Sequence, residues 1–113
     1  MGFWHPYPPG PGVEEKYNTS GIIPFKNNLY QNTPNPASNH TIIKYSIAKK
    51  GNVLLEVYNT AGQRVATLVN EEQMPGIYKV TLQNLKDQIP AGIYFYRLKT
   101  GDYERIKKLV IIH

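Results

Sequence analysis

The side chains that could carry acid–base chemistry or bind a metal are few in this sequence and lie far apart. Its three histidines are His5, His40 and His113, and their separations do not match the close ligand spacing of zinc sites. Glu71 and Glu72 are adjacent, so an extended chain would point them to opposite sides. The sequence therefore predicts no metal site and no paired-carboxylate chemistry.

Motifs for nucleophilic and phosphate chemistry are missing as well. The chain has no cysteine, which excludes thiolate catalysis and disulfide bonds. It contains no G-x-S-x-G turn, no phosphate-binding loop and no dinucleotide-binding glycine pattern. Asp87 and Asp102 stand in predicted turns, where aspartate commonly occurs. We therefore predict that the protein is not an enzyme, with no catalytic residue and no cofactor.

Basic side chains are the main charged feature. The chain carries 13 Lys and Arg against 8 Asp and Glu, for a net charge of +5 at pH 7. A cluster of them lies near the end of the sequence: Arg97, Lys99, Arg105, Lys107 and Lys108. Aromatic residues interleave with this cluster, as on nucleic-acid surfaces. However, strand alternation would bury many of those rings, and lysines commonly protect edge strands from aggregation. We predict no nucleic-acid partner.

The elements that must position these residues are strands. From residue 40 onward, apolar residues recur with a period of two, and helix signals are nearly absent. The predicted strands cover 41–47, 53–58, 64–69, 77–82, 93–99 and 103–112. Short strands at this spacing, joined by Gly, Pro and Asn turns, predict an all-β sandwich. A small barrel is the alternative.

Details of the strands and turns follow from the same alternation. Asn59 to Gly62 is expected to form a hairpin loop with Gly62 in the left-handed region. Residues 83–92 are expected to form a loop. The inward face of the strands predicts a core that contains Ile43, Tyr45, Val57, Tyr78, Val80, Tyr94 and Tyr96.

The chain divides near residue 28. Residues 1–28 are rich in proline and glycine, which predicts an extended linker, and residues 29–113 are the predicted sandwich domain. Phe3, Trp4 and Tyr7 in the linker could pack on the sandwich, contact a preceding domain, form a ligand surface or stay in solvent. No apolar run approaches the ~18 residues that would span a bilayer. The first residues, Met1 to Pro6, show no charged region followed by an apolar stretch and so do not form a signal peptide; if the protein is exported, we expect this chain to be a piece of a longer one.

Short motifs with recognisable residue types run in order through the predicted domain. The first is Asn32-Thr33-Pro34-Asn35-Pro36, a turn that two prolines stiffen. The next are Thr41 to Ile47 and Val57 to Val65. The remaining motifs are Pro75-Gly76-Ile77-Tyr78, Ala91-Gly92-Ile93-Tyr94-Phe95-Tyr96-Arg97-Leu98 and Lys107-Lys108-Leu109-Val110-Ile111.

Together these motifs resemble the type A C-terminal sorting domain of the type IX secretion system of Bacteroidetes and related bacteria. The resemblance spans about residues 29–113. The immunoglobulin-like domain of flagellar hook-capping proteins shares part of the pattern. A generic structural or binding module, for adhesion or carbohydrate binding, is the alternative function because a sandwich fold does not determine function.

The resemblance implies a seven-stranded immunoglobulin-like antiparallel sandwich that follows an N-terminal cargo domain and catalyses nothing. Its implied partners are the type IX translocon and a sortase-like surface protease, which usually removes the domain. The protein would then pass through the periplasm and be secreted or held at the cell surface, with no insertion of this domain into the membrane. The residues expected to serve sorting are Pro34, Asn35, Pro36, Gly62, Gly92, Lys107, Lys108 and Leu109.

Overall fold

The structure, a computed structural model, describes residues 25–113. The predictions for the linker up to residue 24, including His5 and the aromatic residues Phe3, Trp4 and Tyr7, lie outside the described residues. The described part contains seven strands and one short helix. These are β1 (Asn28–Leu29), β2 (Thr41–Ile47), β3 (Gly51–Asn59), β4 (Arg64–Gln73), β5 (Gly76–Leu82), α1 (Leu85–Gln88), β6 (Gly92–Thr100) and β7 (Tyr103–Ile111).

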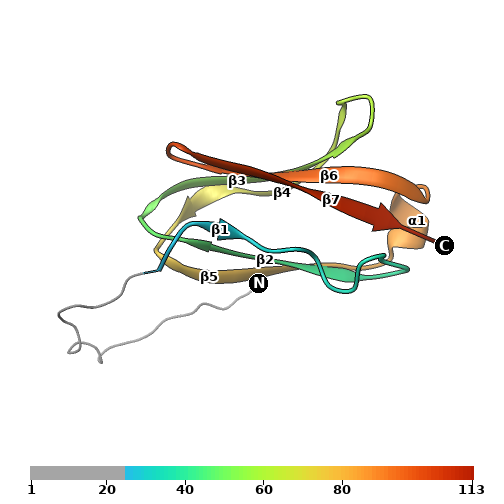
Figure 1. The fold of residues 1–113 in the computed structure, drawn as a ribbon, viewed down its shortest axis with the longest axis horizontal. Helices are drawn as coiled ribbons and strands as arrows, with labels where there is room; N and C mark the ends of the chain where they lie inside the picture. The colour runs from blue at the N-terminus through green and yellow to red at the C-terminus, as the bar shows by residue number, and fades with distance from the viewer. Residues whose placement is uncertain (1–24) are drawn as a thin grey trace.

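The strands form two antiparallel sheets that face each other (Figure 1). One sheet has the order β1-β2-β5 and the other the order β4-β3-β6-β7. Strands one, two and five against strands three, six and seven is the partition of an immunoglobulin sandwich. Here β4 pairs with β3 across a hairpin instead of joining the sheet of β5. The predicted seven-stranded immunoglobulin-like β-sandwich is therefore confirmed.

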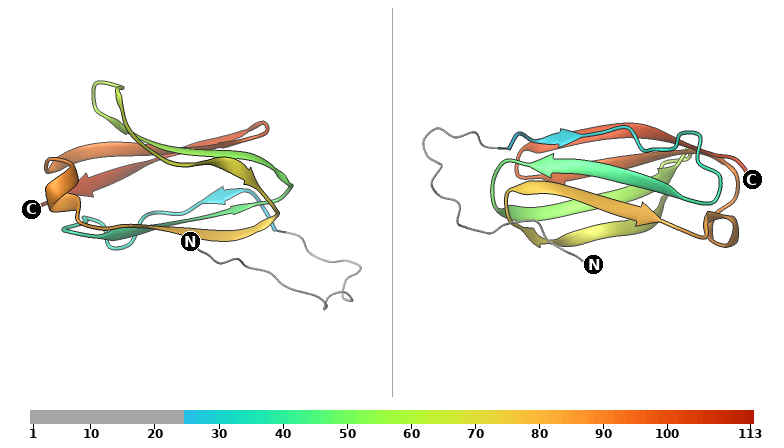
Figure 2. Two further views of the ribbon diagram at one scale, coloured as in Figure 1. Left: turned by 180° about the vertical axis from the view of Figure 1, so that it is seen from behind. Right: turned by 90° about the horizontal axis from the view of Figure 1, so that it is seen from below.

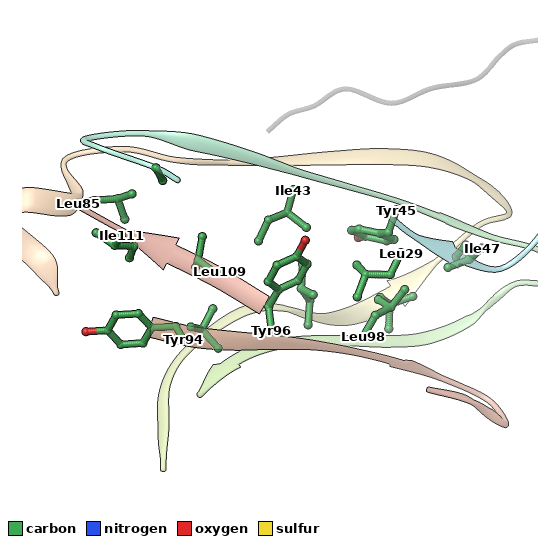
Figure 3. Packing of buried hydrophobic residues seen from close by; sticks show 14 residues of the cluster. Leu29, Ile43, Tyr45, Ile47, Leu85, Tyr94, Tyr96, Leu98, Leu109 and Ile111 are labelled. Carbon is green, nitrogen blue, oxygen red and sulfur yellow. The ribbon is translucent and has the colours of Figure 1, made fainter. Parts of the chain in front are cut away.

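The core fills the space between the two sheets (Figure 3). Period-two alternation directs Ile43, Tyr45 and Ile47 of β2 inward, and each is fully buried. Five of the predicted core residues are buried, and Tyr78 and Val80 are half-buried against the core. Both lie on β5, which ends the three-stranded sheet and is therefore covered on one flank only.

The predicted loop at residues 83–92 contains one short helical turn that the sequence did not indicate. Residues 85–88 form the single turn α1, and its Leu85 is buried. The turn docks on the segment before β2, because the Leu85 N–H donates to the Asn39 carbonyl at 3.0 Å. A four-residue turn shows only one apolar residue to the core, so it leaves no 3.6-residue period in the sequence.

The predicted hairpin loop between β3 and β4 is present, and this hairpin projects beyond the four-stranded sheet (Figure 1). Gly62 has φ 83°, the left-handed region that favours glycine. The Asn59 side chain accepts the N–H groups of Ala61 and Gln63 at 3.0 and 2.9 Å. None of the helical residues within 25–113 forms a segment long and apolar enough to cross a membrane.

Candidate functional site

Residues 31–37, which we call the strap, run along the outer edge of β7 (Figure 2, right). The Ala37 N–H donates to the Val110 carbonyl at 2.7 Å, and the Ile112 N–H donates to the Ala37 carbonyl at 2.8 Å. Ala37 thus forms a parallel bridge with Ile111. The strap completes the pairing of an edge strand that would otherwise expose unpaired backbone groups at this end.

Two side chains of the strap extend this contact. The Asn35 Oδ1 accepts the Val110 N–H at 3.3 Å, and the Gln31 Nε2 donates to the Lys108 carbonyl at 2.7 Å. Pro34, Asn35 and Pro36 themselves are exposed. The strap therefore covers the backbone from residue 108 of β7 to residue 112, just after the strand, and presents its prolines to solvent beside it.

A buried polar network holds the strap at its base. Asn32 is 2% exposed, and its N–H donates to the Tyr96 hydroxyl at 2.8 Å. The Tyr96 hydroxyl in turn donates to the Tyr30 carbonyl at 2.8 Å. The Asn32 Nδ2 donates to the Thr41 hydroxyl at 2.9 Å and to the Pro34 carbonyl at 3.0 Å. Since Thr41 belongs to β2 and Tyr96 to β6, the network connects the strap to both sheets.

The Tyr96 hydroxyl stays protonated in this environment. It points from β6 toward the opposite sheet (Figure 3). Burial raises the pKa of Tyr96 to about 12, and the hydrogen bond from Asn32 lowers it only in part. The hydroxyl therefore remains both a donor and an acceptor at neutral pH, which the network requires.

The sequence model of the secretion system C-terminal sorting domain matches residues 32–112. The chain belongs to this family. The match begins at Asn32 of the strap and ends just after β7, so both sides of the site lie inside it except for Gln31. The family serves type IX secretion in Bacteroidetes, is generally non-catalytic, interacts with the type IX machinery and marks secreted or cell-surface proteins.

No curated protein matches the chain. Among solved structures, the Ig1 domain of mouse SynCAM 2 is similar over 66% of this chain and 86% of that chain, with 13% sequence identity and a TM-score of 0.36.

The structure of this sorting domain brings most of the predicted sorting residues together. Pro34, Asn35 and Pro36 lie beside the end of β7 that contains Lys108. Gly92 opens β6 opposite Ile111, directly across β7 from the strap. The remaining predicted glycine, at position 62, lies apart in the β3–β4 hairpin loop.

The predicted basic pair of the sorting domain does not act as one unit. Consecutive residues of a strand point to opposite faces, so Lys108 is directed outward and is exposed, whereas Lys107 is directed inward opposite Tyr96 and is half-buried. Leu109, the third predicted residue here, is fully buried in the core. Lys108 is therefore an exposed cation on the outer face of the sheet, whereas Lys107 and Leu109 point toward the interior of the sandwich.

Sequence reasoning did not single out Asn32, Thr41 and Tyr96 as a set. One signal was available, because a tyrosine predicted to be in the core must find a partner for its hydroxyl. The identity of that partner depends on how the strap packs, since Asn32 and Tyr96 are 64 positions apart.

A second polar cluster lies on the outer face of the four-stranded sheet. Glu56 is directed away from the core, yet it is only 4% exposed. Its carboxylate contacts Arg64 Nη1 at 3.2 Å and Arg97 Nη2 at 3.3 Å, and it accepts the Tyr58 hydroxyl at 2.6 Å. The hydrogen bond from Tyr58, followed by the two arginines, lowers the pKa of Glu56 against the opposing effect of burial.

This second cluster offers no reactive group. Arg97 also pairs with Glu104 at 3.1 Å and lies over the Tyr58 ring at 5.4 Å. The positive charge of Arg97 is therefore balanced by the carboxylates of Glu56 and Glu104. Within residues 25–113, no group of three His, Cys, Asp or Glu side chains could hold a metal ion. His40 is exposed before β2, and His113 Nε2 lies 2.9 Å from the Ile89 carbonyl.

Proposed function

We propose that this sorting domain directs an N-terminal cargo from the periplasm across the outer membrane through the type IX translocon. A sortase-like surface protease then removes the domain. The observation that supports this best is the contact between the strap and β7 within the family-matched residues. The two motifs that border the match in sequence form one continuous surface.

That surface exists only in the folded domain. Gln31 and Lys108, which are 77 positions apart, meet through one hydrogen bond, and Asn35 reaches Val110 across a similar separation. An unfolded chain would present neither contact. We therefore infer that the machinery reads the folded edge rather than a linear peptide.

Within this surface we assign roles by exposure. Pro34, Asn35, Pro36 and Lys108 are exposed and would contact the machinery. Leu109 is buried and would act through folding, as would Gly62 and Gly92 through their turns.

The linker at residues 1–28 is the proposed cleavage region, and residues 29–113 are the proposed sorting unit. Proline- and glycine-rich chain resists regular structure and is a common place for proteolytic cutting. The last residues of the linker are already held by the sandwich, because the Ser46 hydroxyl donates to the Lys26 carbonyl at 2.5 Å and the Ala48 N–H donates to Asn27 Oδ1 at 2.8 Å. We therefore expect the cut to fall before residue 25.

The test fuses a signal peptide and a reporter to this chain in a type IX-competent bacterium. We expect the reporter at the cell surface or in the medium, cut from the domain. Lys108→Gln should reduce export, whereas Lys79→Gln, which changes an exposed lysine on β5 of the other sheet, should have a smaller effect. Both variants should keep their stability within about 0.5 kcal/mol, as surface substitutions usually do.

Two outcomes would contradict parts of this proposal. If both lysine variants are exported normally, Lys108 is not part of the signal. If the unmodified fusion stays in the periplasm, the sorting role is wrong and a generic immunoglobulin-like binding module becomes the better account.

A further inference from the structure

Among residues 25–113, backbone pairing covers the outer edge of β7 at one end only. The backbone groups of residues 108, 110 and 112 bond the strap. Because N–H and C=O groups of alternate residues point to the same side of an antiparallel strand, Glu104 and Ile106 direct theirs to this same edge. β7 ends its sheet, and β6 is its only strand neighbour within the described chain. β1 passes nearby but pairs with β2.

The side chains of this open stretch, residues 104–107, make it selective. Ile106 is 54% exposed on the outer face. Arg105 and Lys107 share the inward face with the buried Leu109, which places two cations side by side along an unpaired edge. The Arg105 guanidinium lies 5.7 Å from the centre of the Tyr103 ring, and no ion pair within residues 25–113 includes Arg105.

A second copy of this chain is a poor occupant of the open stretch. Two β7 strands paired antiparallel around Ile106 would place Arg105 of each copy opposite Lys107 of the other. Like charges directly opposite in a sheet are destabilising, and inward-pointing charges on an edge strand are a known guard against self-pairing. The same charges favour a strand whose matching positions are acidic.

We propose that the open stretch of β7 binds an extended acidic segment of a partner protein as an added strand. Backbone hydrogen bonds to Glu104 and Ile106 would supply the pairing, and carboxylates opposite Arg105 and Lys107 would supply the selectivity. The inference rests on the proposed sorting function for the partner's identity, since a component of the type IX machinery would carry the acidic strand. The binding itself can be tested without secretion.

The probe is the capped peptide Thr-Thr-Glu-Val-Glu-Thr-Thr, which places its two glutamates on one face of a strand. Its matched control replaces both glutamates with lysine. With the purified full chain, followed by NMR, we expect the acidic probe to bind with a dissociation constant on the order of 1 mM or tighter. The lysine probe should bind at least about tenfold more weakly, because two opposite-charge pairs become like-charge pairs.

The backbone readout separates strand addition from adhesion to a charged surface. On binding of the acidic probe, the Ile106 amide should gain protection from hydrogen exchange. The amides of Arg105 and Lys107 face β6 and should change little. Binding without protection at Ile106 would overturn the proposal, as would no binding of the acidic probe at about 5 mM.

Two variants test the two parts of the recognition. Arg105→Glu with Lys107→Glu should reverse the preference, so that the lysine probe binds about tenfold better than the acidic one. Ile106→Pro removes only the edge-facing N–H, which proline tolerates on an edge strand, and should abolish binding. Ile106→Thr keeps that N–H and should retain binding. An unchanged preference in the double variant would overturn the charge assignment, and full binding by the proline variant would overturn the backbone assignment.

The proposed sorting function and this inference can fail separately. If the purified chain binds the acidic probe but the reporter fusion is not exported, the edge site stands and the sorting role falls. If the fusion is exported but the chain does not bind the acidic probe, the sorting role is supported and the edge site is wrong.

Discussion

The strap network and the Glu56 cluster both bury polar groups around a tyrosine hydroxyl, but they connect different parts of the molecule. The strap network is neutral, lies at the join of the two sheets and links residues 64 positions apart. The Glu56 cluster is ionic, lies on the outer face of one sheet and includes Glu56 and Arg64 from the two strands of one hairpin, only 8 positions apart. The strap network determines how the strap, near the start of the domain, packs beside β7 at its end. The Glu56 cluster adds an ion pair to the β3–β4 hairpin, which its own turn already defines.

The two sites differ in whether a charged group has to be removed from water. A neutral network that is fully satisfied can sit inside the sandwich, because no charge has to leave water. Charged groups are better placed at the surface, where Arg64 keeps 62% of its side chain exposed. We expect the strap network to control the shape of the β7 edge and the ionic cluster to have little influence there.

Leu109→Ala should have the largest effect, because it removes core contacts directly below the strap. Leu109 is fully buried, and truncation of a buried leucine costs about 2–5 kcal/mol. Chemical denaturation measures the loss. Ile106→Ala on the same strand is the control, since Ile106 is half exposed and should change stability by about 0.5 kcal/mol or less. Equal losses at both positions would contradict the burial assignment.

Tyr96→Phe should separate the strap from the sandwich with the core still packed. It leaves the buried Asn32 N–H and the Tyr30 carbonyl without their partner, which costs about 2 kcal/mol. Tyr94→Phe is the control because its hydroxyl makes one bond, to the Pro90 carbonyl, and should cost about 1 kcal/mol. Faster amide exchange at Val110 and Ile112 in the Tyr96 variant alone would show that the strap has loosened. Unchanged exchange there would mean that the network does not hold the strap.

The raised pKa of Tyr96 predicts that the folded domain loses stability at alkaline pH. The unfolded chain loses the Tyr96 proton near pH 10, whereas the folded protein keeps it until about pH 12. The unfolded state therefore binds fewer protons in this range, so stability falls as pH rises through it. Burial also raises the pKa of Tyr45, so Tyr96→Phe should weaken this pH dependence without removing it. Denaturation midpoints between pH 9 and pH 12 measure the slope, and an unchanged slope in the variant would contradict the prediction.

Glu56→Gln should have a smaller effect and the opposite pH signature. The folded pKa of Glu56 lies below its ordinary value of 4.5, so the carboxylate stabilises the fold above that value and the contribution is lost as pH falls through the folded pKa. At neutral pH we expect a loss of about 1 kcal/mol, because exposed Arg64 can be solvated by water. The variant should lose stability less steeply than the parent below pH 4.5. Amide exchange in the strap should stay unchanged, and a change there would remove the contrast between the two clusters.

Gly62→Ala should have an effect about as small as that of Glu56→Gln. The position has φ 83° with open space around it, so the cost is backbone strain alone, about 1 kcal/mol. Gly51→Ala is the control, since Gly51 has no positive φ and an added Cβ would meet only the Thr100 hydroxyl at 3.9 Å. Thermal unfolding should separate the two variants. Similar stability for both would contradict a left-handed turn at position 62.

Much of the fold was determined by the sequence alone. Period-two alternation placed the faces of β2, β3 and β6, because each strand has to hide one face from water. Turn chemistry placed the Asn59–Gly62 loop, since few residues tolerate its left-handed position. The family itself was recognisable from the order of the short motifs.

Tertiary structure decided what the alternation cannot encode. The burial of Glu56 on an outward face depends on Arg64 and Arg97, which neighbouring strands bring beside it. The meeting of Asn32 with Tyr96 likewise depends on the path of the strap across both sheets. A period describes which way a side chain points, but the partner it finds there depends on which strands become neighbours. Local sequence therefore specified the strands, and only their packing specified the edge of β7 that we propose as the recognition surface.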